Sequence, residues 1–341
     1  MKARRWLLGL GVALAVIASI LLTSWATPAL YFDFPFPRLG LVLAAFYLLT
    51  MFSGLFLSRR RYRYLVMPAG FIIVVAWWLS LQPSNAREWQ DDVSRTAWAD
   101  VKGDQITIYN VRNCDYRAEF DYVCAWETRN YDLAKLRGLD IAITYWGSPW
   151  IAHPIASFDF GGQGHLPISI ETRKVMGQGY SAVRGFFRQY ELIYIVSDER
   201  DVIRLRTNYR TGEEVYLFRT TASPEVARGI LLDYLQRINR IHNTPEWYNA
   251  LTNNCTTNIA VAAAGGEGRP VSRDWRILLN GRSDEMLYEN HQLVTDGLSL
   301  PELKERAHIN AAARLAGKDP AFSIRIRENR TGFSAETIGA Y

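Results

Sequence analysis

The residues of this sequence best suited to covalent chemistry lie at 251–260, where Cys255 stands among small hydrogen-bonding residues. An alanine-rich apolar run follows at once, so the pattern predicts a helix capped by Asn253 or Asn254, with the cysteine in its first turn. Unpaired backbone N–H groups and the positive end of the helix dipole favour a thiolate there, and the thiolate is the nucleophilic form of cysteine. A buried cysteine with a structural role fits the same residues. The segment alone therefore leaves two interpretations, a nucleophile and a buried thiol.

A cysteine nucleophile needs a neighbouring base, and the sequence contains five histidines. His153 lies in an apolar, strand-like segment near Ser157, which is the environment expected of a packed site, although a lone histidine in a strand is often structural. His165 lies in a predicted turn and is the second candidate. The remaining three have polar or charged surroundings: His242, His291 and His308. His153 is therefore the predicted base.

Two further roles would complete a thiol site of this kind. Glu171 or Ser169 would orient the imidazole of His153 if the turn between them pairs their strands. The backbone amide of Cys255 and the side chain of Asn254 would form an oxyanion hole. No metal or cofactor is expected, because the sequence has no Cys-x-x-Cys or His-x-x-x-His pair to supply ligands.

Three apolar segments precede the polar part of the chain, at about 6–25, 39–57 and 64–81. Each is close to the length that crosses a bilayer core, and Trp and Tyr residues near their ends suit the membrane interface. A cleaved signal peptide is the alternative for the first segment, but two further segments follow it directly. The sequence thus predicts a membrane region over 1–82 with three transmembrane helices.

Positive charges flank these segments unevenly and predict their orientation, since loops rich in Lys and Arg stay in the cytoplasm. Such residues cluster before the first segment and between the second and third: Lys2, Arg4, Arg5, Arg59, Arg60, Arg61 and Arg63. The chain after residue 83 is then predicted to lie outside a bacterial inner membrane, in the periplasm, which makes this a multi-pass protein. The net charge of +5 is dispersed, so a nucleic-acid partner is not expected.

The three cysteines suit that oxidising compartment. Cys114 and Cys124 are close enough in the sequence to close a small disulfide loop, which would leave Cys255 as a free thiol. They fall in 83–130, predicted to be a linker and the first part of the periplasmic domain.

Residues 131–315 form the predicted thiol domain, and 316–341 a loosely held tail. Apolar alternation and turn residues predict strands at 105–111, 140–146, 150–160, 166–171, 191–196, 202–207 and 214–219. Helices are predicted from Ser223, at the cysteine segment and over 301–315. Because strands and helices do not alternate regularly, the predicted class is α+β.

Several blocks of sequence resemble one bacterial family, which includes the N-terminal periplasmic domain of Lnb-type lipoprotein acyltransferases. These blocks occur in order at 171–174, 185–194, 198–201, 204–208, 247–249 and 252–258. The resemblance covers roughly 130–315 and implies thiol-dependent acyl transfer at the outer face of the inner membrane, with the family's cysteine at Cys255 and its histidine at His153. The order of histidine before cysteine is similar to the permuted NlpC-type, papain-like fold of lecithin:retinol acyltransferase.

Three functions remain open at this point. The first is a membrane-anchored periplasmic acyltransferase in which Cys255 takes an acyl chain from a membrane lipid or lipoprotein and passes it to an amine or hydroxyl. The second is a cysteine hydrolase of cell-wall peptides, with water as the acceptor. The third is a non-catalytic envelope protein with a structural cysteine. The chain is predicted to differ from Lnb-type proteins in its three preceding membrane helices and in lacking an evident membrane domain after the thiol domain, so the lipoprotein substrate is the less secure part of the first hypothesis.

Overall fold

The computed structural model of this chain describes residues 2–56, 60–268, 270, 274–278 and 280–333. Helices make up 47% and strands 26%, which confirms the predicted α+β class. The chain forms two compact units. We call the first the membrane unit (1–84, 180–190 and 247–249) and the second the sheet domain (85–179, 191–246 and 250–341).

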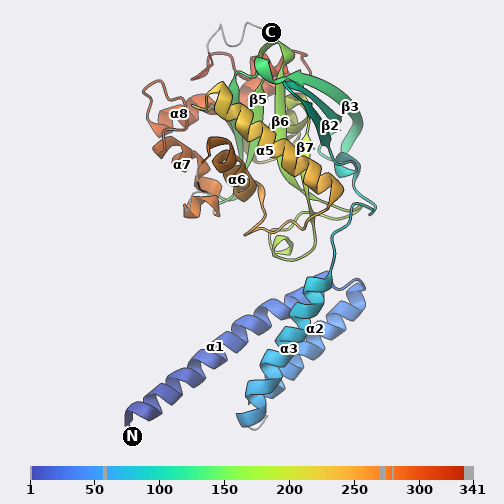
Figure 1. The fold of residues 1–341 in the computed structure, drawn as a ribbon, viewed down its shortest axis with the longest axis vertical. Coiled ribbons are helices and arrows are strands. Elements are labelled where there is room, and N and C mark those ends of the chain that lie inside the picture. Colours follow the sequence, from blue (N-terminus) through green and yellow to red (C-terminus); the bar gives the residue numbers. More distant parts are fainter. Residues whose placement is uncertain (1, 57–59, 269, 271–273, 279, 334–341) are drawn as a thin grey trace. The chain divides into compact units, whose positions relative to one another are not determined.

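The membrane unit contains three consecutive helices (Figure 1): α1 (Lys2–Asp33), α2 (Pro37–Phe56) and α3 (Arg60–Ser80). In the described chain, two helical stretches are long and apolar enough to cross a membrane, Leu10–Asp33 and Pro37–Gly54. The prediction of three transmembrane helices is therefore wrong in number. Residues 57–59, which end the second predicted segment and begin the arginine loop, lie outside the described residues.

The third helix forms but is too short in its apolar part. Its apolar stretch, Met67–Ser80, is about 20 Å long at 1.5 Å per residue, whereas a bilayer core is roughly 30 Å thick. Arginines occupy the first turn of α3 and shorten its charge-free part: Arg60, Arg61 and Arg63. The sequence predicted this segment at 64–81, whereas the helix begins at Arg60 and its apolar stretch begins at Met67.

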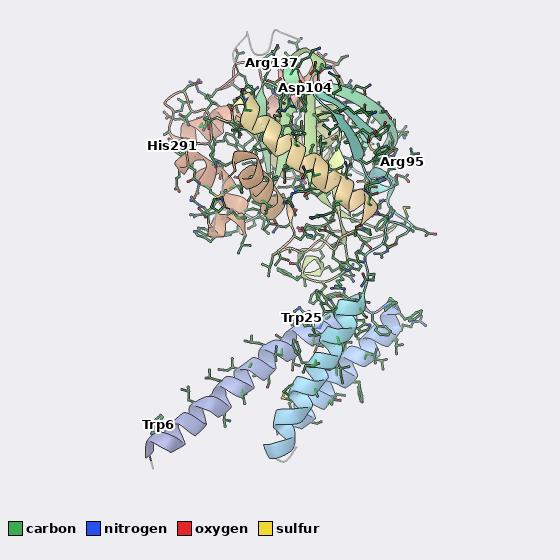
Figure 2. All side chains as sticks on the ribbon, viewed as in Figure 1. Trp6, Trp25, Arg95, Asp104, Arg137 and His291 are labelled. Carbon is green, nitrogen blue, oxygen red and sulfur yellow. A yellow bond between two sulfur atoms is a disulfide. The ribbon has the colours of Figure 1, made fainter. Side chains whose placement is uncertain are left out.

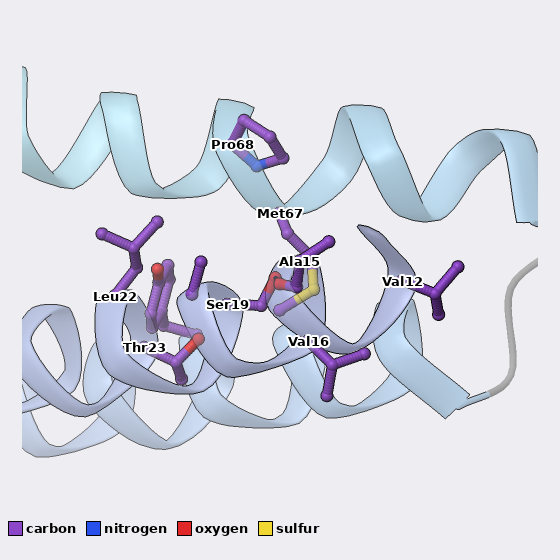
Figure 3. A pocket seen from close by; sticks show the side chains of 10 residues that line it. Val12, Ala15, Val16, Ser19, Leu22, Thr23, Met67 and Pro68 are labelled. Carbon is purple, nitrogen blue, oxygen red and sulfur yellow. Dashed lines mark hydrogen bonds between the residues drawn. The ribbon is translucent and has the colours of Figure 1, made fainter. Parts of the chain in front are cut away.

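Aromatic side chains hold α1 against α3. Trp25 contacts Phe71 and Trp78 edge to face, with ring centroids 5.8 and 5.2 Å apart. Nearer the N-terminus of α1, the two helices border an apolar crevice of about 210 Å³ whose walls include Ala15 and Ser19 (Figure 3). Trp6 and Trp25 lie towards opposite ends of α1 (Figure 2), as aromatic residues do at the two surfaces of a membrane.

The sheet domain begins with a small antiparallel sheet in the order β1-β2-β3. Its strands are β1 (Trp98–Lys102), β2 (Gln105–Ala118) and β3 (Asp121–Asp132). Cys114 and Cys124 face each other across β2 and β3 and form the predicted disulfide. The sequence predicted only the first half of β2, because the long hairpin that β2 and β3 form carries polar and charged residues on its outer face.

A five-stranded antiparallel sheet forms the centre of the domain, in the order β7-β6-β5-β4-β8. Its strands match five of the predicted ones: β4 (Gly138–Trp146), β5 (Ala152–Asp159), β6 (His165–Arg173), β7 (Glu191–Val196) and β8 (Glu213–Arg219). β5 and β6 pair directly, with Ile155 opposite Ser169 and Asp159 opposite His165. Side chains alternate between the faces of a strand, so this register places His153 and Glu171 on the same face.

The strand predicted at 202–207 is wrong. The structure has α4 (Glu199–Arg204) there, followed by a wide helical turn over Leu205–Tyr209. The alternation of apolar residues with Arg204 and Arg206 suggested one buried and one solvent-exposed face. Both arginines are in fact buried, because carboxylates pair with them, and the apparent two-residue period therefore carried no information about exposure.

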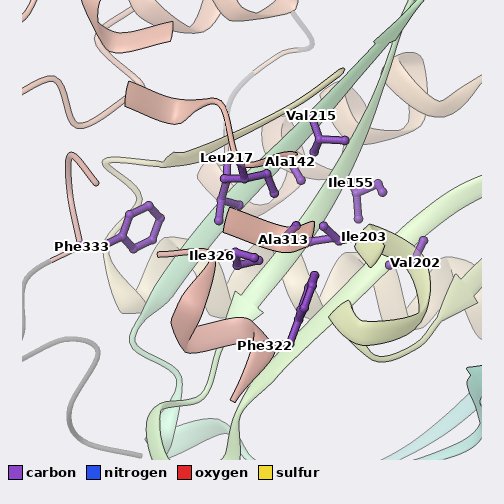
Figure 4. Packing of buried hydrophobic residues seen from close by; sticks show 11 residues of the cluster. Ala142, Ile155, Val202, Ile203, Val215, Leu217, Ala313, Phe322, Ile326 and Phe333 are labelled. Atoms are coloured by element: carbon purple, nitrogen blue, oxygen red, sulfur yellow. The ribbon is translucent and has the colours of Figure 1, made fainter. Parts of the chain in front are cut away.

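Helices cover both faces of the central sheet. The α-helices of the remaining chain are α5 (Pro224–Asn243), α6 (Cys255–Glu267), α7 (Ser283–Glu289), α8 (Leu300–Ala307), α9 (Asn310–Ala316) and α10 (Phe322–Arg325), and the helix predicted at 301–315 is two helices, α8 and α9. Tyr234 of α5 contacts Phe158 and Tyr194 on one face, where α6 packs beside α5 (Figure 1). On the other face, Phe322 of α10 packs with Ile155 and other apolar residues (Figure 4). Part of the predicted loose tail is thus buried structure, while residues 334–341 lie outside the described residues.

Candidate active site

The cysteine segment folds as the sequence predicts, with Cys255 as the first residue of α6. Asn254 caps the helix: its side-chain oxygen accepts a hydrogen bond from the backbone N–H of Thr257 at 2.9 Å, and the Thr257 hydroxyl accepts one from the backbone N–H of Asn254 at 2.9 Å. Of the three cysteines, Cys255 is the free one, and it is buried with 6% exposure. The sulfur therefore lies at the positive end of a helix and largely away from water.

A network of amides fixes this helix start. Asn258 donates hydrogen bonds from its side chain to Asn253 Oδ1 and to the carbonyl of Asn254, each at 2.8 Å. Tyr194 of β7 donates its hydroxyl proton to Asn258 Oδ1 at 3.0 Å, which ties the helix to the sheet. The Asn254 side-chain nitrogen donates to the carbonyl of Ala250 at 2.7 Å. Both ends of the Asn254 amide are thus engaged within its own turn.

The amide that reaches the sulfur belongs to a different residue, Asn280. Its Nδ2 lies 3.7 Å from Cys255 Sγ and 2.8 Å from Thr256 Oγ1. Its Oδ1 accepts a hydrogen bond from the backbone N–H of Ala152 at 2.9 Å, at the start of the strand that carries His153. The sequence did not identify Asn280, because it lies in an irregular stretch more than twenty residues after the cysteine.

The structure brings His153 together with both of the partners considered for it. His153 Nε2 lies 2.8 Å from Ser169 Oγ and 3.2 Å from Glu171 Oε1. Ser169 in turn donates its hydroxyl proton to Glu171 Oε1 at 2.6 Å. Nε2 is directed at these two groups, and the imidazole of His153 also interacts electrostatically with the thiol of Cys255.

A buried arginine holds the carboxylate of this set. Arg206 donates to Glu171 Oε1 at 2.8 Å and also pairs with Glu213 at 3.3 Å. It comes from the helical turn that the sequence presented as a strand, which is why it was not predicted. Glu171 therefore has a histidine on one side and a guanidinium on the other.

These contacts raise the pKa of His153 and lower the pKa values of Cys255 and Glu171. Burial by itself lowers the pKa of His153, but the charge of Glu171 and the interactions with Cys255 and the Glu171 side chain together outweigh it and raise that pKa to about 9. Burial works against ionisation of Cys255, yet the hydrogen bond and charge of His153 hold the pKa of the thiol below its usual value. Burial likewise opposes the Glu171 carboxylate, and His153 and Arg206 keep its pKa well below the usual value. Each shift favours the charged form of its group over the neutral form.

The four other histidines do not approach Cys255. His165 is buried and lies 3.7 Å from a carboxylate oxygen of Asp140, while His242 Nδ1 shares a hydrogen bond with the Thr96 hydroxyl at 2.7 Å. His308 pairs with Glu214 on the surface, and His291 is exposed. Among the described residues, no group of three His, Cys, Asp or Glu side chains is placed to hold a metal ion.

A polar cavity of about 400 Å³ lies beside the loop that joins β4 to β5. It is lined by that loop and by Tyr145, Lys304 and Gly281, the residue after Asn280. The backbone of Gly281 lies close to that of Pro149 and Trp150, so a side chain at Gly281 would clash with them. This close approach keeps Asn280 beside the start of β5.

Comparison with known families identifies one match. Residues 122–281 match the family model of the Lnb N-terminal periplasmic domain, as the sequence motifs predict. The matched range contains Cys255, His153, Glu171 and Asn280. No curated protein and no solved structure matches the chain. Together with the two apolar helices, the match indicates a membrane-anchored periplasmic protein.

Proposed function

We propose that this chain, whose residues 122–281 match the model of the Lnb N-terminal periplasmic domain, is a thiol acyltransferase that moves an acyl chain of a membrane lipid or lipoprotein. The observation that carries the proposal is the set of Cys255, His153 and Glu171, in which the thiol pKa is lowered and the imidazole pKa raised. A structural cysteine needs no such partners. An acyl-transferring cysteine needs both a reactive thiolate and a proton donor.

The proposed reaction begins with attack of the Cys255 thiolate on the ester carbonyl carbon of the donor. The tetrahedral intermediate collapses with cleavage of the carbon–oxygen bond, and the leaving alkoxide takes a proton from the His153 imidazolium. An acyl thioester and a neutral imidazole result. An acceptor amine or alcohol then attacks the thioester and gives its proton to His153. The bond between the acyl carbon and the sulfur breaks, Cys255 leaves as a thiolate, and the original ion pair is restored.

The oxyanion of each tetrahedral intermediate needs hydrogen-bond donors at the start of α6. The backbone N–H of Cys255 is one candidate, as the sequence suggests. For the second donor we propose Asn280 Nδ2, since it already lies 3.7 Å from the sulfur, whereas the Asn254 amide is engaged in capping. Glu171, held by Arg206, keeps the imidazole oriented and stabilises its charge.

The membrane anchor favours transfer over hydrolysis. A lipid or lipoprotein substrate stays in the bilayer, so an enzyme anchored by apolar helices long enough to cross the membrane would meet it without a soluble carrier. The sulfur is also buried, which limits the access of water as a competing acceptor. A cysteine hydrolase of cell-wall peptides would use the same residues with water as acceptor, and it is the second candidate.

Reconstitution of the full chain into phospholipid vesicles with a synthetic lipopeptide bearing a free amine tests the proposal. Mass spectrometry should show the lipopeptide gaining one acyl chain, and Cys255→Ala should abolish the gain. His308→Gln, on a surface histidine, is the matched control and should retain it. A full transfer rate with Cys255→Ala would show that Cys255 is not the nucleophile.

A comparison in cells separates the two enzymatic candidates. In a deletion strain, the acyltransferase predicts altered acylation of lipoprotein N-termini and unchanged cell-wall peptides. Unchanged lipoproteins with altered cell-wall peptides would support the hydrolase instead. No change in either would favour the non-catalytic envelope protein.

A further inference from the structure

Residues 180–190 form the second part of the connection between β6 and β7, and they pack within the membrane unit at the C-terminal end of α1. Asp33, the last residue of α1, accepts hydrogen bonds from the backbone N–H of Arg188 at 3.1 Å and from Gln189 Nε2 at 2.8 Å. Trp78 Nε1 of α3 donates to the same carboxylate at 2.7 Å. One carboxylate therefore joins two helices and this segment.

The same segment caps α3. The final carbonyl groups of a helix have no partner within the helix. Arg188 donates to the carbonyl oxygens of Leu79, at 3.4 Å, and of Leu81, and Trp247 Nε1 donates to Leu81 at 3.3 Å. The Arg188 guanidinium also lies over the Trp78 ring, 4.1 Å from its centroid. The helix end is thus satisfied by residues far away in the sequence.

An aromatic side chain seals this contact. Phe187 is buried in the apolar core that the membrane helices share, and its ring lies 5.3 Å from that of Phe32. The backbone N–H of Tyr248 donates to the carbonyl of Tyr190 at 3.0 Å, so residues 247–249 are held to the same segment. The segment is an ordered part of the membrane unit.

Three of its apolar side chains are exposed. Tyr180, Val183 and Phe186 are 49%, 58% and 39% exposed, which is unusual for three large apolar residues within seven positions. Arg184 lies among them, with its guanidinium over the Phe32 ring. Aromatic and aliphatic side chains interspersed with arginine are typical of segments that lie in the headgroup region of a bilayer.

We propose that residues 180–188 form a second membrane contact, which inserts Tyr180, Val183 and Phe186 into the headgroup region of the outer leaflet. The occupant of this surface is lipid because the segment is hydrogen-bonded to the end of α1, whose apolar stretch is long enough to cross a membrane. The arginines match anionic headgroups. The inference does not depend on acyl transfer, since it concerns the surface alone.

Chain connectivity gives this contact a consequence for the candidate site. The segment follows β6, which carries Ser169 and Glu171, and residues 247–249 end six positions before Cys255. The proposed contact therefore holds two segments that are close in sequence to candidate site residues, 180–190 and 247–249. Asp33 is a positioning residue for this arrangement.

Lipid contact can be measured on the full chain in vesicles of a zwitterionic and an anionic phospholipid. Val183→Cys in a Cys255→Ala background carries an environment-sensitive fluorophore, and the matched control is Leu315→Cys in α9, which is 90% exposed in the sheet domain. The label at 183 should shift to shorter wavelength and be quenched by lipids with a nitroxide near the headgroup. The label at 315 should show neither effect.

Two results would overturn the proposal. One is quenching at 183 no stronger than at 315, which means a water-exposed loop. The other is a wavelength shift without lipid quenching, which means a protein partner covers the segment. Asp33→Ala adds a test of the anchor: most of the quenching at 183 should be lost while circular dichroism stays unchanged, and full quenching in this variant would remove Asp33 from the proposal.

Discussion

His153 and His165 are two buried histidines on the same face of the same pair of strands, one at each end, and they differ in almost every chemical respect. His153 is the second residue of β5 and lies beside Ser169 and Glu171. His165 begins β6, opposite Asp159, and lies 3.7 and 3.9 Å from oxygens of Asp140 and Asp159. Both have carboxylates and arginine nearby, so composition does not separate them.

The set around His165 is closed. Arg327, brought in by the C-terminal segment, pairs with Asp140 at 2.8 Å and with Glu199 at 2.7 Å. Arg219 pairs with Asp140 and Asp159 at 2.7 and 2.9 Å. Burial, followed by the charge of Arg327, lowers the pKa of His165, so that this ring stays neutral.

The set around His153 is open at one side and contains a thiol. The Glu171 side chain is 25% exposed, whereas those of Asp140 and Glu199 are fully buried. Of these two sets, the one around His153 contains a group that can react as an anion, the thiol of Cys255. A buried network of charges is therefore weak support for catalysis, and the neighbouring nucleophile is what gives the His153 set its chemical meaning.

Replacing each histidine with glutamine is the sharpest way to break this comparison. His153→Gln should lower acyl transfer by at least about 10³-fold, because the leaving group loses its proton donor. His165→Gln should keep the transfer rate per folded molecule and reduce stability instead. The measurement is the transfer rate normalised to folded protein. Equal losses of rate would mean that the second set also takes part in the reaction.

Arg327 tests the structural side of the comparison. Arg327→Met leaves Asp140 and Glu199 buried without their partner, and breaking a buried ion pair in this way costs about 3–5 kcal/mol. Urea unfolding followed by fluorescence measures the loss. Arg325→Met is the matched control, since Arg325 is exposed and forms only surface pairs, and it should change stability by about 0.5 kcal/mol at most. A similar loss for both variants would contradict a structural role specific to Arg327.

The asparagine pair separates catalysis from capping. Asn280→Ala should lower the transfer rate by about 10²-fold, the effect of removing one oxyanion donor. Asn254→Ala should instead cost about 1 kcal/mol of stability, the typical effect of losing a helix cap. Rate and urea midpoint are measured for each variant. The reverse result would restore the oxyanion role that the sequence suggested for Asn254.

The sequence revealed those parts of the site that depend on local pattern. The helix start at Cys255, the strands of His153 and Glu171 and their pairing all follow from turn residues and alternation. It missed Asn280 and Arg206, because each reaches the site from a segment with no regular pattern or a misleading one. The papain-like arrangement stays a prediction, since no solved structure matches the chain.

The sequence did not predict the closed set around His165, for the same reason. It depends on Arg327, which comes from the predicted loose tail nearly two hundred residues after Asp140. Charged residues in a polar tail normally remain in solvent. Only the packing of Phe322 and Ile326 on the sheet buries this arginine.

The smallest expected effect is on the pH dependence of the unfolding free energy, to which His153 and His165 contribute in opposite directions. The folded pKa of His165 lies below its unfolded value, so the unfolded chain binds the extra proton and stability falls as the pH drops below about 6.5. The folded pKa of His153 is raised to about 9, so its contribution is complete below about 6.5 and is lost as the pH rises to about 9. Each slope is at most about 1.4 kcal/mol per pH unit.

Unfolding free energies measured from pH 5 to 10 test this difference. The Cys255→Ala background removes the titration of the thiol, and Glu171 still raises the pKa of His153 there. His165→Gln should flatten the acid side of the curve and His153→Gln the alkaline side. If both substitutions flatten the same side, the two histidines hold the same charge in the folded protein. The thiol of Cys255 would then be the one chemical difference between the set around His153 and the set around His165. The proposed ion pair of Cys255 with His153 would lose its electrostatic support.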